Sequence, residues 1–340
     1  MTLKQKPARW LNYTLFLSLT LAGLAQDKLR IESPGFQGVI HDNLSNQKRQ
    51  GSGLSPLMLS EFPKASLYRE DAVGINFEHI FNGAKAEYNL SMFTPRKDTC
   101  RLETLGRHRV ALGWPSEGSS WGVEAQMSYD FSHQNQIDLH FEATPTRPLF
   151  SQNYLAMMWA SYMNRAIDRR IHFWGQEGDR TGWVTFGEGE GEKIETGTVA
   201  HIDVPSLPFQ TGAQTLNLIE NPEKKFILPF YYGFLDGDHD LETKDDRLLY
   251  LVLFDQTESI RFAMWNFARN ASNQPDTHSP AWDWQYVIRD PVINHPYGYR
   301  ARIVIKPFQG RKQIAQEYDQ WRIDLKKTLP PLPRQATAQP

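Results

Sequence analysis

The stretch WGVEAQMSYDF, residues 121–131, decides the fold class because apolar and polar residues alternate along its whole length. Successive side chains of a β-strand point to opposite faces, so this alternation predicts a strand with one buried face and one polar face. A polar turn at 132–136 separates this run from a second alternating run at 137–143. Together the two runs predict an antiparallel hairpin.

Strand patterns continue through most of the chain on both sides of this hairpin. Residues 153–164 are mostly apolar without alternation, as expected for a strand buried on both faces. One helix is predicted, at 312–325, where Ile314, Tyr318 and Trp321 recur on one helical face. Further strands are predicted at 170–174, 182–186, 226–234, 248–255, 259–267, 282–289 and 299–307. The sequence therefore predicts an all-β protein, a large antiparallel β-sandwich with one C-terminal amphipathic helix.

The first 25 residues are typical of a signal peptide. A basic start is followed by an apolar run at 11–24, which is too short to span a membrane. Small residues precede Gln26, so cleavage after Ala25 and export to the periplasm or the medium are expected. Retention of the segment as a membrane anchor is the alternative.

Three segments follow in the mature chain. Residues 26–70 are predicted to be a loop-rich N-terminal segment, because 33–56 is rich in Gly, Ser, Asn and Gln and is expected to wrap the surface. Residues 71–327 form the predicted β-sandwich domain. Residues 328–340 are predicted to be a disordered, proline-rich tail.

Composition narrows the classes of partner. The formal net charge of the 340 residues is only −2, so neither nucleic acid nor an anionic membrane surface is expected as a partner. Aromatic residues make up 12% of the chain, and such residues favour strands and flat surfaces that can stack on sugar rings. Cys100 is the only cysteine, so an intramolecular disulfide is impossible, and a buried structural role is expected for it.

The strand rhythm, the aromatic–polar alternation and the closing strand YRARIVIKPF, residues 299–308, resemble the galactose mutarotase-like superfamily of large β-sandwiches. Aldose epimerases and domains of polysaccharide lyases and glycoside hydrolases use this fold. The resemblance covers most of residues 70–325 and implies a protein that binds or acts on carbohydrate. The local signatures of the epimerases, around two histidines and a late glutamate, are not found in this chain.

The segment AWDWQYVIR, residues 281–289, supplies the first catalytic candidate. As a strand it places Trp282 and Trp284 on one face, where they could stack on a sugar, and Asp283 on the other. A carboxyl group in a partly desolvated cleft can act as general acid or base. Asp283 reaches a ligand only if the chain bends at 277–280. The alternative is structural, because one hairpin register sets Asp283 opposite Lys306 as a cross-strand ion pair.

Three histidines give further candidates. His79 lies in a short segment with Asn76 and Glu78, and a neutral imidazole there can take a proton near pH 7. His140 lies on the polar face of the predicted hairpin. His172 follows an isoleucine in a predicted strand and is a candidate for substrate binding, with a structural hydrogen bond as the alternative for it.

Two arginines of the closing strand could bind an acidic sugar. Arg300 and Arg302 share a face if 299–308 is a strand, and two guanidinium groups can hold a uronate carboxylate. Tyr299, their neighbour, is a candidate base. The alternative is a solvated face neutralised by acidic neighbours.

Asp236, Asp238 and Asp240 alternate in a spacing that can hold Ca²⁺ through oxygen ligands. The segment is not an EF-hand, because the sixth position is not glycine and Arg247 stands at the twelfth. A solvated acidic turn is the alternative, so Ca²⁺ is the one cofactor considered and none is required. The sequence contains no HExxH, GxSxG, P-loop or CxxC motif, which disfavours zinc peptidases, serine hydrolases, NTPases and thiol oxidoreductases.

These features predict an exported carbohydrate-active protein that acts on a glycan or oligosaccharide by acid/base chemistry. A lyase would use His79 or Tyr299 as base beside an arginine. A hydrolase would use Asp283 and Glu78 as its two carboxyl groups, and an epimerase is the third possibility. The alternative is a non-catalytic carbohydrate-binding or cell-surface structural module, and the sequence does not separate an enzyme from such a module.

Overall fold

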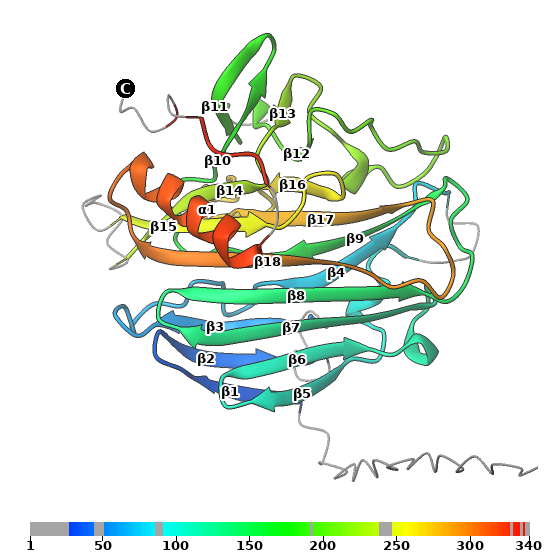
Figure 1. Ribbon diagram of the computed structural model, residues 1–340, viewed down its shortest axis with the longest axis horizontal. Helices are drawn as coiled ribbons and strands as arrows, with labels where there is room; N and C mark the ends of the chain where they lie inside the picture. Colours follow the sequence, from blue (N-terminus) through cyan, green and yellow to red (C-terminus); the bar gives the residue numbers. More distant parts are fainter. Residues whose placement is uncertain are drawn as a thin grey trace, which may run out of the picture.

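Antiparallel strands form three sheets in the computed structural model (Figure 1), which describes residues 27–43, 51–85, 91–190, 193–237, 247–326, 329–333 and 336. The elements are β1 (Lys28–Glu32), β2 (Phe36–His41), β3 (Gly53–Leu59), β4 (Asn76–Phe81), β5 (Arg101–Gly106), β6 (Arg109–Trp114), β7 (Val123–His133), β8 (Gln136–Pro145), β9 (Tyr154–Ala160), β10 (Ile171–Glu177), β11 (Arg180–Phe186), β12 (Gly197–Ala200), β13 (Lys224–Phe226), β14 (Phe230–Asp236), β15 (Arg247–Phe254), β16 (Ile260–Trp265), β17 (Ala281–Arg289), β18 (Tyr297–Pro307) and α1 (Arg311–Leu325). The predicted all-β sandwich with one C-terminal helix is confirmed over the described residues.

The largest sheet has ten strands, in the order β11-β10-β14-β15-β18-β8-β7-β6-β5, with β13 paired to β10. β7 and β8 form the predicted hairpin, in which Tyr129 pairs with Leu139 and Met127 with Phe141. The alternation of β7 is the one that its sequence predicts, since Val123 is buried and Glu124 is exposed. β18 pairs with both β15 and β8 and so joins the two halves of this sheet.

A five-stranded sheet, in the order β12-β16-β17-β9-β4, forms the second layer. Every residue of β9 is buried, which confirms the prediction of a strand covered on both faces. The inner face of this sheet packs on the ten-stranded sheet. Connecting segments cover its outer face, where Leu207 and Leu218 pack against side chains of β9 and β16.

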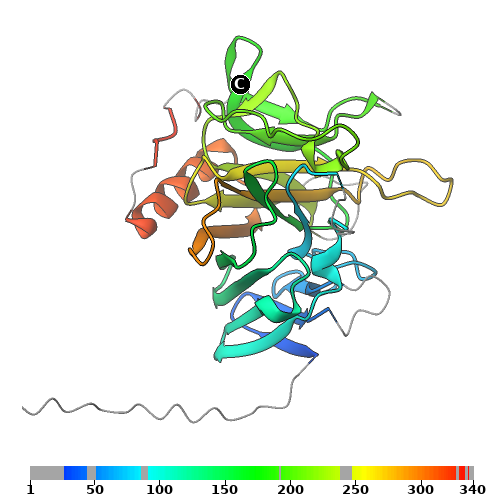
Figure 2. The same cartoon turned by 90° about the vertical axis from the view of Figure 1, so that its right-hand side faces the viewer.

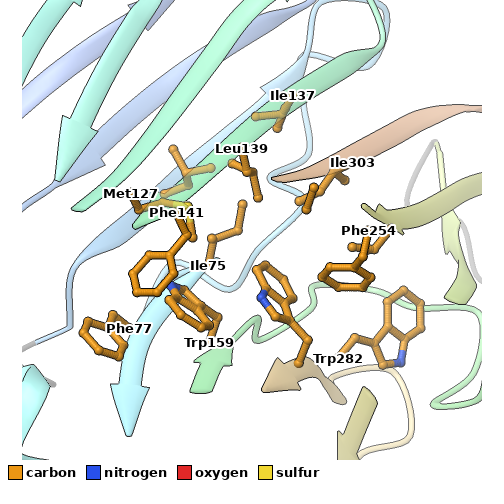
Figure 3. Close-up of a cluster of buried hydrophobic side chains, with 14 of the residues drawn as sticks. Ile75, Phe77, Met127, Ile137, Leu139, Phe141, Trp159, Phe254, Trp282 and Ile303 are labelled. Carbon is orange, nitrogen blue, oxygen red and sulfur yellow. The ribbon is translucent and has the colours of Figure 1, made fainter. Parts of the chain in front are cut away.

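Aromatic side chains fill the space between these two layers (Figure 3). Trp159 stacks on Phe77 with ring centroids 5.2 Å apart and meets Phe141 edge-on at 4.5 Å. Trp282 lies in the same core and has no exposed surface. Each such ring removes a large apolar area from water and adds favourable ring contacts, so much of the aromatic content serves the interior.

The helix α1 lies across the outer face of the ten-stranded sheet, in front of β15 and β18 (Figure 1). Ile314, Tyr318 and Trp321 face the sheet, as their spacing predicts. The Trp321 indole nitrogen donates to the carbonyl of Phe254 at 3.0 Å. This helix therefore buries strand surface that would otherwise face water.

The N-terminal segment differs from its prediction as a surface loop. β1, β2 and β3 form a three-stranded antiparallel sheet, and Phe36, Ile40 and Leu54 have no exposed surface. The apolar residues of this segment are separated by Gly, Ser, Asn and Gln, which concealed short strands that tertiary packing stabilises.

Both ends of the chain also bear on the predictions. The predicted signal peptide, residues 1–25, lies outside the described residues. Contrary to the predicted disordered tail, Leu329 and Ala336 are buried, and the Trp183 indole nitrogen donates to the carbonyl of Ala336 at 2.9 Å. None of the helices in the described ranges is long and apolar enough to cross a membrane.

Candidate functional site

β4 brings two titratable side chains together on the outer face of the five-stranded sheet. Its pairing with β9 shifts between Phe77, which pairs with Trp159, and His79, which pairs with Met158. Such a bulge sets two residues of one strand against one of the other, so strict alternation is interrupted. The Nε2 atom of His79 consequently lies 3.8 Å from Oε1 of Glu78.

Glu78 is the centre of this group, and its side chain is only 3% exposed. The Tyr162 hydroxyl lies 2.9 Å from both carboxylate oxygens and donates to them. Arg96 Nη1 donates at 3.2 Å and Asn76 Nδ2 at 3.3 Å. We refer to Asn76, Glu78, His79, Arg96 and Tyr162 as the Glu78 cluster. A buried carboxylate needs such partners, because its desolvation is otherwise costly.

His79 is held from the side opposite Glu78. The side-chain amide of Asn217, in the short 3-10 helix Leu216–Leu218, donates to Nδ1, and the ring meets Phe93 edge-on at 4.3 Å. Burial lowers the pKa of His79 to about 4, against the opposing effect of the Glu78 charge. The imidazole is therefore neutral at pH 7, with its proton on Nε2 because Nδ1 accepts the amide hydrogen bond.

Asp283, on β17, which β9 separates from β4, is buried at 1% exposure. Its Oδ1 atom accepts from the backbone N–H of Ser161 at 2.8 Å. Burial raises the pKa of Asp283 well above its ordinary value, and the charge of Glu78 adds to the increase, although the Ser161 N–H works in the other direction. The protonated acid is thus the favoured form in the folded protein.

A cavity of about 240 Å³ lies beside the Glu78 cluster, and Tyr162 forms part of its wall. Phe267, another wall residue, is 59% exposed and stacks on Trp265 with ring centroids 5.5 Å apart and planes 10° apart. Phe267 belongs to the connection between β16 and β17, which projects at the right of Figure 2. Through its hydroxyl group, Tyr162 joins this cavity to the buried carboxylate of Glu78. We call it the Phe267 cavity.

Two arginines also line the Phe267 cavity. Arg69 donates to Asp71 through two hydrogen bonds of 2.8 and 2.6 Å, so its charge is balanced at the cavity wall. Arg269, on the projecting connection, is exposed. The wall therefore combines an apolar ring, a phenol and guanidinium groups, which suits a polar ring-shaped ligand.

The indole rings of β17 do not form a binding surface. Trp282 and Trp284 have no exposed surface, so the prediction that they stack on a sugar is wrong for this structure. Tyr299 lies in the same core, where its hydroxyl accepts from the Trp284 indole nitrogen at 2.6 Å. Burial raises the pKa of Tyr299 well above its ordinary value, which argues against the predicted role as a base.

The predicted ion pair between Asp283 and Lys306 is also wrong. β17 pairs with β16 and β9 rather than with β18, and Asp283 stands opposite Ala263. Lys306 instead forms an ion pair with Glu317 of α1. The predicted bend at 277–280 does not bring Asp283 to a surface, because this side chain stays inside the protein.

The two candidate arginines and His140 lie on the ten-stranded sheet, away from the Glu78 cluster. Arg302 pairs with Asp138 at 2.6 Å and Asp324 at 2.5 Å, so acidic neighbours neutralise it as in the alternative, although it is largely buried and not on a solvated face. Arg300 is exposed and stands opposite His140 in the register of β18 and β8. These residues do not join the group around Glu78.

His172 has the structural role that was the alternative for it. Its Nδ1 atom lies 3.0 Å from the Thr185 hydroxyl, and its ring stacks on Tyr232 at 5.1 Å. Burial lowers the pKa of His172 to about 4. Its place is therefore in the ten-stranded sheet and not at the Glu78 cluster.

The predicted calcium loop can be followed only at its first residue. Asp236 is buried at the end of β14, whereas Asp238 and Asp240 lie outside the described residues. Over the ranges that the structure describes, no group of three or more His, Cys, Asp or Glu side chains is placed to hold a metal ion.

The sequence predicts three members of the Glu78 cluster, Asn76, Glu78 and His79, but not Arg96 or Tyr162. It also does not predict Asn217 and Phe267, which lie beside the cluster. Tyr162 follows β9 in an apolar run and was interpreted as part of a buried strand. Arg96 and Asn217 come from connections that carry no strand pattern, and Phe267 ends a predicted strand. No local signal marks these residues, because distant segments bring them together.

Comparison with known proteins gives a likeness in shape only. No family model matches the chain, and no curated protein matches it in sequence. Among solved structures, a putative aldose 1-epimerase from Escherichia coli K12 covers 83% of this chain and 99% of its own, with a TM-score of 0.45 and 6% identity. An aldose epimerase homologue from C. elegans covers 83% and 99%, with a TM-score of 0.41 and 9% identity.

A galactose mutarotase-like protein from Lactobacillus casei ATCC 334 covers 82% of this chain and 100% of its own, with a TM-score of 0.43 and 10% identity. The identities of 6 to 10% and TM-scores below 0.5 of these three proteins assign neither an activity nor a site residue to this chain.

Proposed function

We propose that this protein is an exported carbohydrate-active enzyme that moves protons at a sugar, with Tyr162 as the residue that contacts the substrate. The observation that supports this proposal is the position of the Tyr162 side chain. It lines the Phe267 cavity while its hydroxyl donates to both oxygens of Glu78. A phenol between a cavity and a carboxylate can exchange a proton with each of them.

In the proposed mechanism, the Tyr162 oxygen receives a proton from the sugar while its own proton passes to Glu78. The same two transfers in reverse return a proton to the sugar. Arg96 donates to Glu78 and offsets its negative charge before the transfer. His79 is neutral near pH 7, and its Nε2 atom lies 3.8 Å from Oε1 of Glu78, so it stands beside the carboxylate without adding charge.

Among the reaction types considered, hydrolysis by two carboxyl groups has the least support. That mechanism needs two carboxyl groups facing the scissile bond. Asp283 is buried, bound to the Ser161 N–H, and absent from the wall of the Phe267 cavity. Epimerisation and elimination require a proton-transfer residue at the sugar, which Tyr162 supplies.

The phenylalanine of the cavity wall favours a second candidate function, a non-catalytic carbohydrate-binding module. Phe267 is exposed and rests on Trp265, an arrangement that can stack on a sugar ring without any reaction. Binding of a neutral or acidic mono- or oligosaccharide without formation of any product would support this candidate.

The test is a screen of neutral and acidic mono- and oligosaccharides, with products followed by proton NMR. On a substrate that reacts, Tyr162→Phe should lower kcat by at least about a hundredfold, because the ring stays and only the hydroxyl group that transfers the proton is lost. Tyr297→Phe is the matched control, since the Tyr297 hydroxyl accepts from the Val292 N–H far along the chain from the Glu78 cluster. Unchanged turnover by Tyr162→Phe would remove Tyr162 from the mechanism.

Export is proposed from the basic and apolar start of the sequence alone. N-terminal sequencing of protein recovered from the periplasm or the medium should begin near Gln26. Recovery of the chain from the cytoplasm with Met1 intact would contradict export.

A further inference from the structure

Buried polar atoms without partners gather on the outer face of the five-stranded sheet. Among the buried side-chain atoms without a hydrogen-bond partner in the described ranges, those of this region are the following: His79 Nε2, Tyr154 OH, Asn217 Oδ1, Arg261 Nε, Trp265 Nε1 and Asp283 Oδ2; further such atoms, among them Trp114 Nε1 and Trp121 Nε1, belong to other parts of the protein. A buried polar atom without a partner destabilises the folded state, and folded proteins satisfy nearly all such atoms. A group of them on one face therefore calls for a binding partner.

The segment 201–221 covers this face without forming a strand of its own sheet. Leu207 and Leu218 pack on the side chains of β9 and β16. The Asn217 carbonyl accepts from Gln285 Nε2 at 3.1 Å, and its amide holds His79. The same segment leaves Phe209 half-exposed. It is thus attached to the sheet by separate contacts, which include the bridge between Glu220 and Thr198 of β12, rather than along a continuous ladder.

We infer that this face is the sugar-recognition surface of the proposed site, that residues 201–221 are its movable cover, and that its ligand is an uncharged, hydroxyl-rich sugar. The inference rests on the proposed function. It adds the class of substrate and the route by which the sugar reaches the site, which is displacement of residues 201–221. The surface continues from the Phe267 cavity, because Trp265 and Ala281 belong both to this face and to the neighbourhood of Phe267.

The unpartnered atoms define the chemistry of the ligand. The indole N–H of Trp265 and the guanidinium N–H of Arg261 are donors, the Asn217 oxygen is an acceptor, and a tyrosine hydroxyl is both. A hydroxyl group can both donate and accept a hydrogen bond, so a sugar with several hydroxyls can pair with the donors and the acceptors of this face. A single anion can only accept and would leave the acceptors without partners. Ala156, Ala160, Ala263 and Ala281 are small side chains of this face, and they are packed in one cluster with Leu207 and Leu218, so a ring would take the place of the cover side chains when residues 201–221 move.

The charges of this region favour a neutral sugar over a uronate. Arg261 is fully buried and donates to Glu220 at 3.1 Å and to Gln285 at 3.0 Å. Arg96 pairs with Glu78, as Arg69 does with Asp71. A ligand carboxylate at Arg261, Arg96 or Arg69 would have to compete with a carboxylate that already pairs with that cation.

The test measures binding directly, by calorimetry with glucose, galactose, mannose, glucuronate and galacturonate. At least one neutral sugar should bind more tightly than both uronates. Tyr154→Phe should weaken that binding at least about fivefold, the loss expected for one hydrogen bond. The melting temperature of the free variant should not fall, because the Tyr154 hydroxyl has no partner in the described structure. Tyr297→Phe, with its hydroxyl already bonded to the Val292 N–H, should leave binding unchanged.

Hydrogen exchange in the presence and absence of the same five sugars tests whether residues 201–221 move. Backbone amides of 205–216 should exchange faster than those of β16 and β17 in the free protein and become protected when the neutral sugar binds. Tighter binding of the uronates, an unchanged affinity in Tyr154→Phe, or no change of exchange in 205–216 would each overturn the inference. Loss of turnover in Tyr162→Phe together with an unchanged affinity in Tyr154→Phe would support the proposed function and overturn this inference. Sugar binding that depends on Tyr154, without turnover of any sugar, would support this inference and contradict the proposed catalytic function.

Discussion

Replacing Asp283 by asparagine should stabilise this protein by an amount that grows with pH. Burial raises the pKa of Asp283 well above its ordinary value, with a further contribution from the charge of Glu78 and an opposing one from the Ser161 N–H. The folded protein therefore keeps a proton on this side chain that the unfolded chain releases. Asparagine preserves the oxygen that accepts from Ser161 and has no proton to release near neutral pH.

The size of the effect follows from proton linkage. When a folded-state pKa is raised, the folded state binds more protons than the unfolded state, so stability falls as pH rises above the unfolded pKa of about 3.9. A difference of one proton changes the free energy of unfolding by about 1.4 kcal/mol per pH unit. The stability advantage of Asp283→Asn over the wild type should therefore increase with pH above about 4, by at most about 1.4 kcal/mol for each pH unit.

Urea denaturation followed by tryptophan fluorescence at several values in this range measures that difference, since the buried indoles of the core report unfolding. Asp179→Asn is the control, because Asp179 is exposed in the turn between β10 and β11 and should give curves parallel to the wild type. Parallel curves for Asp283→Asn and the wild type would show that Asp283 is ionised in the folded protein, and the reasoning would then be refuted.

Two further predictions concern histidine burial and the docking of α1. Burial lowers the pKa of both His79 and His172 to about 4, so the unfolded state binds more protons and stability should be lost as pH falls from about 6.5 towards 4. Each histidine should account for about 3 kcal/mol, and a thermal-unfolding series should show a shallower acid loss for His172→Gln. Arg302→Ala should cost about 2 kcal/mol in urea denaturation, because it leaves Asp138 and Asp324 unpaired and removes a cation–π contact of 4.9 Å with Trp321. Exposed Arg300→Ala should change stability by less than about 0.5 kcal/mol, and an equal loss in both variants would contradict the argument.

The part of the fold that could be predicted is the part in which local pattern and tertiary burial agree. β7 and β8 alternate because one face meets the core and the other meets water, so their hairpin is visible in the sequence. β9 is visible for the opposite reason, since both of its faces are covered. The strands around Phe36 and Leu54 were missed because polar spacers dilute their pattern and burial comes from partners elsewhere in the chain.

The candidate site was predictable only where its residues are neighbours in sequence. Asn76, Glu78 and His79 were identified together because they lie on one short segment. The bulge that turns Glu78 and His79 towards each other depends on the register of β4 with β9. This register cannot be predicted from the local sequence. Tyr162 reaches Glu78 across 84 positions of the chain, so only the folded structure joins them.

The place of β18 in the ten-stranded sheet has a consequence for how the chain can be assembled. β18 lies between β15 and β8, whose residues precede it by tens to more than a hundred positions, and its pairing makes one sheet of two separate halves. Until residues 297–307 are available, both β15 and β8 are open edges, and the aromatic core lacks the strand that carries Tyr299 and Ile303. A chain shortened before this strand would expose two unpaired edges that invite association between copies. Closure of the ten-stranded sheet is therefore a late event in synthesis, because it needs residues 297–307 near the end of the sequence.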